Sequence, residues 1–454
     1  MSTITRKALL AVSLLGLTAG MALAADPPAA PVVPAPAPAV SSPLELTPLQ
    51  AGEAAVLESL DVRQAEEAVR QAQARQAQAQ VGNQPTASIA AQLGVTGPVT
   101  KVTFNNQTIS VGTPQVEQVV IQVAVPVYTG GRVEWAVRAA AAGVKASRTE
   151  LEVTRRAIRE AALEAAYGVL RASELAGVAD RQVTSNQAHL RIAEAMLNAG
   201  TVAQFEVIQA QTALSQAIGA QIAARTAVDQ ALAQLRQILQ LPQTFPLQIV
   251  SPVAPTQRPA GGLADLIEQS WTQRPELTAA GFQVRRAEAG ISLARASDAI
   301  SMSLGASTSR GMPSTFTTGE SWQVVLSINQ PLLDGGAKRA ALADAQSLLR
   351  SAQIALESQR QQIALQVTQQ YLALDQATQQ LQVAVQGVVE ARERLRVANV
   401  RFGAGVTNGV EVLDAEVALT AAEVSEVNAN YDVQTALYRL QQALGQPLQA
   451  EAAK

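Results

Sequence analysis

Hydrophobic positions along the chain follow two different periods. Residues 51–80 contain no proline and place Leu60 and Val69 on one helical face, which predicts a helix. Residues 86–96 then alternate apolar and polar side chains, and residues 118–125 do so again after a polar loop. Strict alternation puts apolar side chains on one face and polar side chains on the other, as in a β-strand. The pattern therefore predicts a helix followed by two strands.

The second strand leads through a glycine pair into a very long helical stretch. Residues 132–198 and, later, residues 337–402 contain no proline. At 1.5 Å per residue, a stretch of about 65 residues makes a rod of roughly 100 Å. Each stretch ends at a glycine-containing turn, Asn198-Ala199-Gly200 or Gly403-Ala404-Gly405, and a returning helix follows. Because such a rod does not fit inside a small globule, we expect two long helical hairpins.

The two rods belong to two copies of one structural unit. Pro126 and Pro331 are separated by the same number of positions as Gly200 and Gly405. Chance matches would not keep one register over such a span, so we interpret the chain as a duplicated subdomain. We expect the following order of segments: a signal peptide at 1–24, a Pro/Ala-rich tether at 25–43, a first repeat at 44–240, a linker at 241–262, a second repeat at 263–447 and a C-terminal tail at 448–454.

The first residues have the layout of a secretory signal peptide. Arg6 and Lys7 precede an apolar run at 8–19, and the small-x-small triplet Ala22-Leu23-Ala24 follows. The alternative is a retained membrane anchor, but the apolar run is shorter than the roughly 20 residues that a spanning helix needs. We therefore expect a secreted chain that is cleaved after Ala24.

The composition excludes several classes of protein. Aromatic residues make up 3% of the 454 residues, whereas they normally supply much of a globular core. The chain has no cysteine, so disulfides and thiolate metal sites are excluded, and its one histidine, His189, we expect to be an ordinary surface residue. With 34 basic and 37 acidic residues there is no basic field for nucleic acid. We therefore expect no enzyme, no cofactor and no metal site.

The alternating strands have two interpretations. They can form a soluble, half-buried hairpin or, in a secreted chain, strands of a transmembrane barrel with the apolar face toward lipid and the polar face toward the lumen. Four strands per chain cannot close, because the smallest such barrels have about eight. A dimer would reach about eight strands, whose interior side chains fill, and a trimer would reach about twelve and keep a lumen. We therefore expect a homotrimer.

Three motifs resemble the TolC-like outer-membrane efflux protein family. Residues 198–203 followed by Glu206-Val207 resemble the family's first helical tip. Phe402, Gly405 and residues 410–415 resemble the second tip, at the matching point of the second copy. Arg274-Pro275-Glu276-Leu277 resembles a segment found where the second copy's helix begins.

The resemblance implies both a fold and a function. The fold would be mainly α with a small β part, in which long antiparallel helical hairpins form a trimeric α-barrel capped by a transmembrane β-barrel of about twelve strands. The protein would be a passive exit duct in the cell outer membrane, extending through the periplasm, of a tripartite efflux pump or a type I secretion system. Its partners would be outer-membrane lipid, a periplasmic adaptor (membrane fusion) protein and an inner-membrane transporter of the RND, ABC or MFS type. The alternative function is a non-conducting coiled-coil spacer of the cell envelope, which has no use for a lipid-facing barrel.

Two sets of residues at the tips are functional candidates. Glu411 and Asp414 share one helical face, and threefold symmetry would stack them into two carboxylate rings that attract cations and constrict a pore. The alternative is a pair of solvated charges at a helix end. The first copy has Glu206 and Gln209 at the equivalent places, and Thr407 stands where the family often has an arginine. The candidates for helical-tip contacts with the adaptor are Asn198, Gly200, Val202, Glu206, Phe402, Gly405, Val412 and Leu413.

Overall fold

The computed structural model describes residues 44–95, 97–98, 100–105, 107–111, 115–251, 259–311 and 319–446. The expected signal peptide, the tether and the C-terminal tail lie outside these residues, as do residues 252–258 of the linker. Residues from Leu44 onward form one compact unit.

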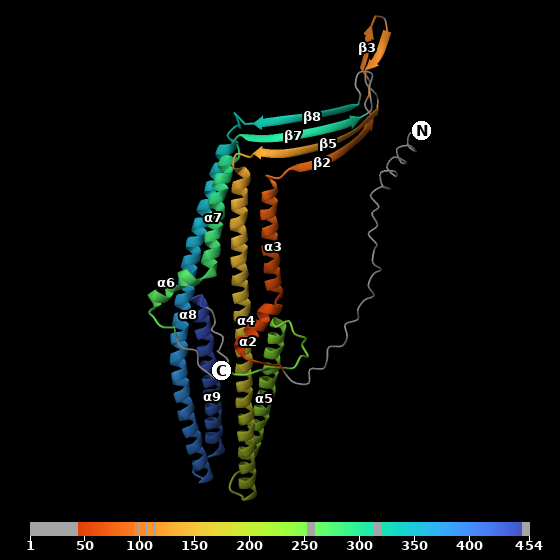
Figure 1. Cartoon of the computed structure of the whole chain (residues 1–454). Coiled ribbons are helices and arrows are strands. Elements are labelled where there is room, and N and C mark those ends of the chain that lie inside the picture. The colour runs from red at the N-terminus through yellow and green to blue at the C-terminus, as the bar shows by residue number, and fades with distance from the viewer. Residues whose placement is uncertain are drawn as a thin grey trace, which may run out of the picture. The chain divides into compact units, whose positions relative to one another are not determined.

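Two long helical hairpins dominate this unit (Figure 1). In the first, α4 has 67 residues and α5 has 35, and in the second α8 and α9 have the same two lengths. The helices of the described chain are α2 (Pro48–Glu58), α3 (Leu60–Val81), α4 (Arg132–Asn198), α5 (Gln204–Ile238), α6 (Leu263–Gln273), α7 (Pro275–Ala296), α8 (Ala337–Gly403) and α9 (Gly409–Ala443). Within the described residues, no helix combines the length and the apolarity that crossing a membrane requires.

One antiparallel sheet joins the two copies. Its strand order is β2 (Thr86–Val95), β5 (Gln115–Tyr128), β7 (Ser301–Gly311) and β8 (Glu320–Asn329). The central pair, β5 and β7, contains one strand from each copy. The outer strands β2 and β8 therefore each have a strand neighbour on one side only among the described strands.

The register of the sheet separates apolar from polar side chains. Ile89 lies opposite Ile121, which continues across the sheet to Thr308 and Trp322. The neighbouring row on the same face is Ala87, Val123, Ala306 and Val324. Between these two rows, on the other face, lie Ser88, Gln122, Ser307 and Gln323. Because side chains alternate along every strand, the sheet has one mainly apolar and one mainly polar face.

The helices run from this sheet to two turns at their far end (Figure 1). Helix α4 packs against α3, α5 and α7, and α8 packs against α7 and α9. Contacts of α4 with α7 and with α9 bring the two copies together along their length. The sheet and the turns thus occupy opposite ends of the same pair of rods.

Each copy has its own buried core where the returning helix ends. Leu163 of α4 and Leu235 of α5 are fully buried in the first core, and Ile363 of α8 and Leu440 of α9 in the second. Tyrosines link the copies, because the ring of Tyr167 lies 5.3 Å from that of Tyr438 and 6.4 Å from that of Tyr431, measured between centroids. Three of the scarce aromatic residues therefore meet at this junction.

The structure corrects two expectations about local structure. The single helix expected at 51–80 is broken at Ser59, whose hydroxyl accepts a hydrogen bond from the Val62 N–H and starts a new helix, α3. The polar loop of the first copy contains a hairpin, β3 (Thr100–Phe104) and β4 (Gln107–Val111). Asn105 in its turn has φ 54°, a left-handed conformation that asparagine tolerates.

The linker between the copies also contains a strand. Its residues Leu247–Ile249 form a strand, β6, that pairs in parallel with β1 (Leu44–Leu46). Leu247 and Ile249 are buried in the first core, whereas Gln248 between them is exposed. The linker therefore contributes to the core of the first copy.

A buried arginine fastens the start of α7 to the second hairpin. Arg274 donates from Nη1 to the Gln442 carbonyl oxygen at 3.0 Å and from Nη2 to Gln366 Oε1 at 2.7 Å. Its Nε lies 3.2 Å from Glu276 Oε2. Only 9% of Arg274 is exposed, so its loss would leave buried acceptors and a carboxylate without a partner.

We expect Arg274→Ala to lower the free energy of unfolding by about 3–5 kcal/mol, the range for breaking a buried ion pair. Guanidinium titration followed by circular dichroism of the helices measures it. Arg360→Ala is the matched control, because Arg360 is half exposed and pairs only with Glu357 at 3.8 Å in the ion pairs of the described chain. The control should change the free energy by less than about 0.5 kcal/mol. Equal unfolding midpoints for the two variants would contradict the role of Arg274.

Candidate functional site

Both hairpins turn through the same backbone motif. The Gly200 N–H bonds to the Leu197 carbonyl and the Thr201 N–H bonds to that of Met196, both at 2.9 Å. The second hairpin repeats this pattern around Gly405. Gly200 and Gly405 have φ 73° and 70°, a left-handed conformation that closes a helix and strongly favours glycine. These two glycines therefore allow the backbone conformation that ends each long helix.

The predicted tip residues divide into an exposed and a buried group. Asn198, Gly200 and Gly405 are exposed on the turns. Phe402 and Val412, by contrast, are 4% and 0% exposed and pack with Ala398 and Ala415 in a small core of the second tip. Glu206 and Val202 are half-buried on the first tip, and Leu413 is half-buried on the second. Phe402 and Val412 therefore support the tip from inside.

A carboxylate of the first tip caps a helix of the second. Glu206 Oε2 accepts a hydrogen bond from the Gly409 N–H, the first residue of α9, at 3.2 Å. Asn408, the residue before α9, makes no side-chain cap of its own. A negative charge at a helix N-terminus is favourable, because the first N–H groups have no partner inside the helix. Glu206 therefore couples the two hairpins.

Further side-chain contacts join the hairpins above the tips. Ser185 of α4 donates to Glu416 Oε1 of α9 at 2.7 Å. Glu423 of α9, whose side chain is 13% exposed, lies 3.1 Å from Arg181 of α4 and 3.3 Å from Arg392 of α8. One carboxylate thus holds a guanidinium from each hairpin.

The expectation that His189 is a surface residue is wrong. His189 is 6% exposed, and its ring lies 5.6 Å from that of Phe402, centroid to centroid. Burial lowers the pKa of His189 below its ordinary 6.5, and the nearby carboxylates of Glu416 and Glu206 oppose that change. The periodic apolar pattern alone did not reveal this burial, because the covering residues come from the other copy.

The two candidate pore carboxylates differ in their surroundings. Glu411 accepts from Arg401 Nη1 at 2.5 Å and also from the Thr407 hydroxyl. Asp414 is exposed one turn later on α9. The charge of Glu411 is therefore partly compensated within its own hairpin, whereas the ion pairs found among the described residues include none for Asp414.

Sequence comparison identifies the family. A family model described as outer membrane efflux protein matches residues 52–240 and 266–446, one segment for each copy. The chain belongs to the outer membrane efflux protein family. The resemblance predicted from the tip motifs is thereby confirmed.

Relatives in this family match part of the chain. The outer membrane protein OprJ of Pseudomonas aeruginosa is 30% identical over 205 residues, which are 43% of this chain and 42% of OprJ. The solvent efflux pump outer membrane protein SrpC of Pseudomonas putida is 29% identical over 273 residues, which are 58% of this chain and 57% of SrpC. The chain thus spans about half the length of these relatives.

Solved structures of this fold extend the comparison to most of the chain. The crystal structure of CusC, which concerns folding and transmembrane channel formation, superposes with a TM-score of 0.76 at 19% identity. The match covers 89% of this chain and 93% of CusC. The predicted fold class, mainly α with a small β part, is confirmed, and family and fold are those of channel proteins.

Three residues that join the hairpins of this family member were missed by sequence reasoning. Ser185, Glu416 and Glu423 do not belong to a tip motif. Glu416 offers one signal, because it interrupts the apolar residues Ala415 and Val417 on α9. A charged residue inside an apolar run suggests a buried polar contact, since it is otherwise costly to bury.

We expect the tips to loosen in acid. Because the unfolded chain binds the His189 proton more readily than the folded chain, stability is complete above pH 6.5 and decreases as the pH falls below it. The free energy of unfolding should change by at most about 1.4 kcal/mol per pH unit, because one proton is involved. Hydrogen exchange at the tip amides, corrected for intrinsic rates, between pH 7 and pH 5 measures it. His189→Gln should reduce the slope, and an unchanged slope in that variant would disprove the role of His189.

Proposed function

We propose that the protein is the outer-membrane, periplasm-spanning exit duct of a tripartite efflux pump or type I secretion system. The observation that carries the proposal is the four-stranded sheet with an apolar and a polar face and two outer strands, β2 and β8. An outer strand leaves a row of backbone donors and acceptors to be paired. In a bilayer these groups need partners, so such a sheet has to close on itself.

Closure by three copies would satisfy these groups. The β8 strand of one copy would pair with the β2 strand of the next, which gives a barrel of about twelve strands with a lumen. Exposed apolar residues support the orientation: Ile89 is 71% exposed and Trp322 is 79% exposed in the single chain. Their face would contact outer-membrane lipid, and the row of Ser88 and Gln122 would face the lumen. The family and the CusC fold support a channel of this kind.

The tips would then form the periplasmic end of the duct. Their exposed residues Asn198, Gly200 and Gly405 would meet the periplasmic adaptor, with Val202, Glu206 and Leu413 beside them. Phe402 and Val412 would hold these surfaces in place from the buried side. The similarity to a solvent efflux pump component supports an inner-membrane transporter of the RND, ABC or MFS type as the third partner.

Glu411 and Asp414 would form carboxylate rings at the constriction of this duct. Because Arg401 compensates part of the Glu411 charge, Asp414 would contribute more of the field that attracts cations. The channel itself would be passive and would need no cofactor.

We expect Gly405→Pro and Gly200→Val to reduce export to background while the trimer still forms. Both changes oppose the left-handed backbone of the turn, which lies far from the sheet. Export from a deletion strain and cross-linking of the outer-membrane fraction measure the two effects. Gly219→Ala is the matched control, because this helical glycine has open space around it. Normal export by both tip variants would remove the tips from adaptor docking, and a monomer would refute the barrel.

We expect Asp414→Asn to lower the cation selectivity of single channels in planar bilayers more than Glu411→Gln does. The double variant keeps the shape of both side chains and should weaken block by multivalent cations from the periplasmic side. The amount of trimer recovered from the double variant should be nearly the same as from the parent. Unchanged selectivity in the double variant would show that both carboxylates face bulk solvent. If the protein in the planar bilayer passes no current, the result would support the alternative function of a non-conducting spacer.

A further inference from the structure

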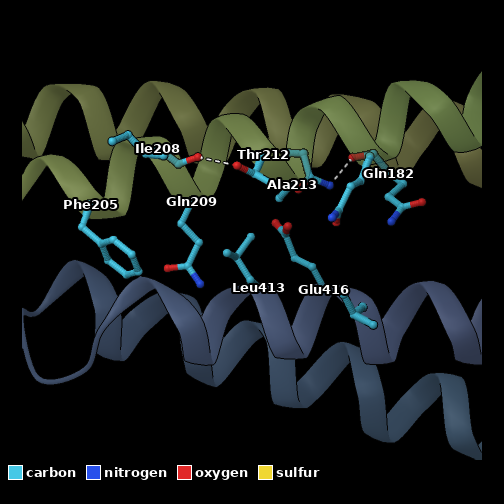
Figure 2. Close-up of a pocket in the computed structure, with 11 residues that line it drawn as sticks. Gln182, Phe205, Ile208, Gln209, Thr212, Ala213, Leu413 and Glu416 are labelled. Atoms are coloured by element: carbon cyan, nitrogen blue, oxygen red, sulfur yellow. Dashed lines mark hydrogen bonds between the residues drawn. The ribbon is translucent and has the colours of Figure 1, made fainter.

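A cavity of about 400 Å³ lies between the two hairpins, close to the tips (Figure 2). Its walls come from α5 and α9, with Gln182 and Asn186 of α4 at one side. Figure 2 shows Gln209 and Glu416 extending into the space between the helices from opposite walls. A volume of this size lies within the range of small-molecule sites, roughly 300–1,000 Å³.

Two polar atoms of this cavity are hydrogen-bond acceptors without a partner among the described residues. Glu416 is 7% exposed, and its Oε1 accepts from Ser185, but its Oε2 is buried without a hydrogen-bond partner. Gln209 Oε1 is also buried without one. Burying an acceptor without a donor is unfavourable, and more so for a charged group. Neither atom has a donor among the described residues, so both can accept from a ligand in the cavity.

Two nearby donors are already engaged. The Thr212 hydroxyl donates to the Ile208 carbonyl and the Asn186 amide nitrogen donates to the Gln182 carbonyl, both at 2.9 Å (Figure 2). Burial keeps the neighbouring His189 largely neutral at pH 7, because its pKa is lowered. The negative charge of Glu416 therefore has no compensating cation beside it among these groups.

The exposed residues that line the cavity are apolar apart from Thr212 and Gln216. Phe205 is 66% exposed, Val417 63% and Ile208 52%, and Leu413 is half-buried. A hydrated inorganic cation gains little from such a rim, whereas an organic cation gains from burying its hydrocarbon part and from contact with an aromatic ring. The combination of an apolar rim and a buried carboxylate therefore selects for an organic cation.

We propose that this cavity binds a small organic cation, with an ammonium, amidinium or guanidinium group on an apolar body, and that Glu416 is its counter-ion. The cationic group donates to Glu416 Oε2 and Gln209 Oε1, and the apolar body lies against Phe205 and Val417. Because Gln209 belongs to α5 and Glu416 to α9, the ligand bridges the two hairpins. Binding at this site does not depend on whether the protein conducts.

Calorimetry with benzamidine and the purified full-length protein in detergent tests the proposal. Benzamidine should bind saturably, once per chain, and the neutral isostere benzamide at least about tenfold more weakly. Glu416→Gln keeps the shape and should weaken benzamidine binding at least about tenfold. Glu194→Gln is the matched control on the exposed surface of α4 and should bind as the parent does.

Three outcomes would overturn the proposal: no saturable binding of benzamidine, equal affinity for benzamide, or unchanged affinity in Glu416→Gln. Circular dichroism and cross-linking check that Glu416→Gln folds and assembles. If Glu416→Gln does not fold or assemble, benzamidine binding to Phe205→Ala is measured instead, because this exposed side chain contributes little to folding. Phe205→Ala should weaken benzamidine binding severalfold, and an unchanged affinity there would also refute the site.

Discussion

The pairing of β5 with β7 is the constraint on which the remaining architecture depends. It joins the two copies in a single sheet, so α4, which follows β5, lies beside α7, which leads into β7. The same pairing aligns Val123 with Ala306 and Gln122 with Ser307, which gives the sheet its two faces. A shift of one residue would exchange those faces. The position of the tips and the character of the sheet are thus set by one antiparallel ladder.

Duplication produced two hairpins of equal length whose tips carry different chemistry. Glu206 and Glu411 occupy equivalent places, yet Glu206 reaches across to cap α9 while Glu411 turns back to Arg401 of its own hairpin. The carboxylate of the first copy therefore contacts the second hairpin, whereas the carboxylate of the second copy contacts its own hairpin. This asymmetry gives one chain both an attachment between hairpins and a separate charged surface at the tip.

Much of the fold could be predicted from the sequence because its signals are local. The helical period and the absence of proline predicted both ends of α4 correctly. Gly200 and Gly405 predicted the positions of both turns. Contacts between the copies could not be predicted, since the period of one helix does not reveal what covers it. His189 and Glu416 are buried for that reason, and Phe402 and Val412, which were expected on the docking surface, lie inside. The β3–β4 hairpin was missed because its strands are short, with five residues each, and mix polar with apolar residues.

The shared carboxylate of Glu423 affects how the hairpins can separate. Its side chain is held by Arg181 from α4 and by Arg392 from α8, and α8 moves with α9 as one hairpin. If the hairpins part, Glu423 loses the first guanidinium but keeps the second, so this carboxylate stays compensated throughout the movement. The Ser185–Glu416 hydrogen bond lacks such a reserve partner. Separation of the hairpins would therefore leave Glu416 without its donor, and it would also break the Arg171–Asp432 and Arg439–Glu164 ion pairs. Glu423 differs from these carboxylates, because Arg392 of its own hairpin stays beside it.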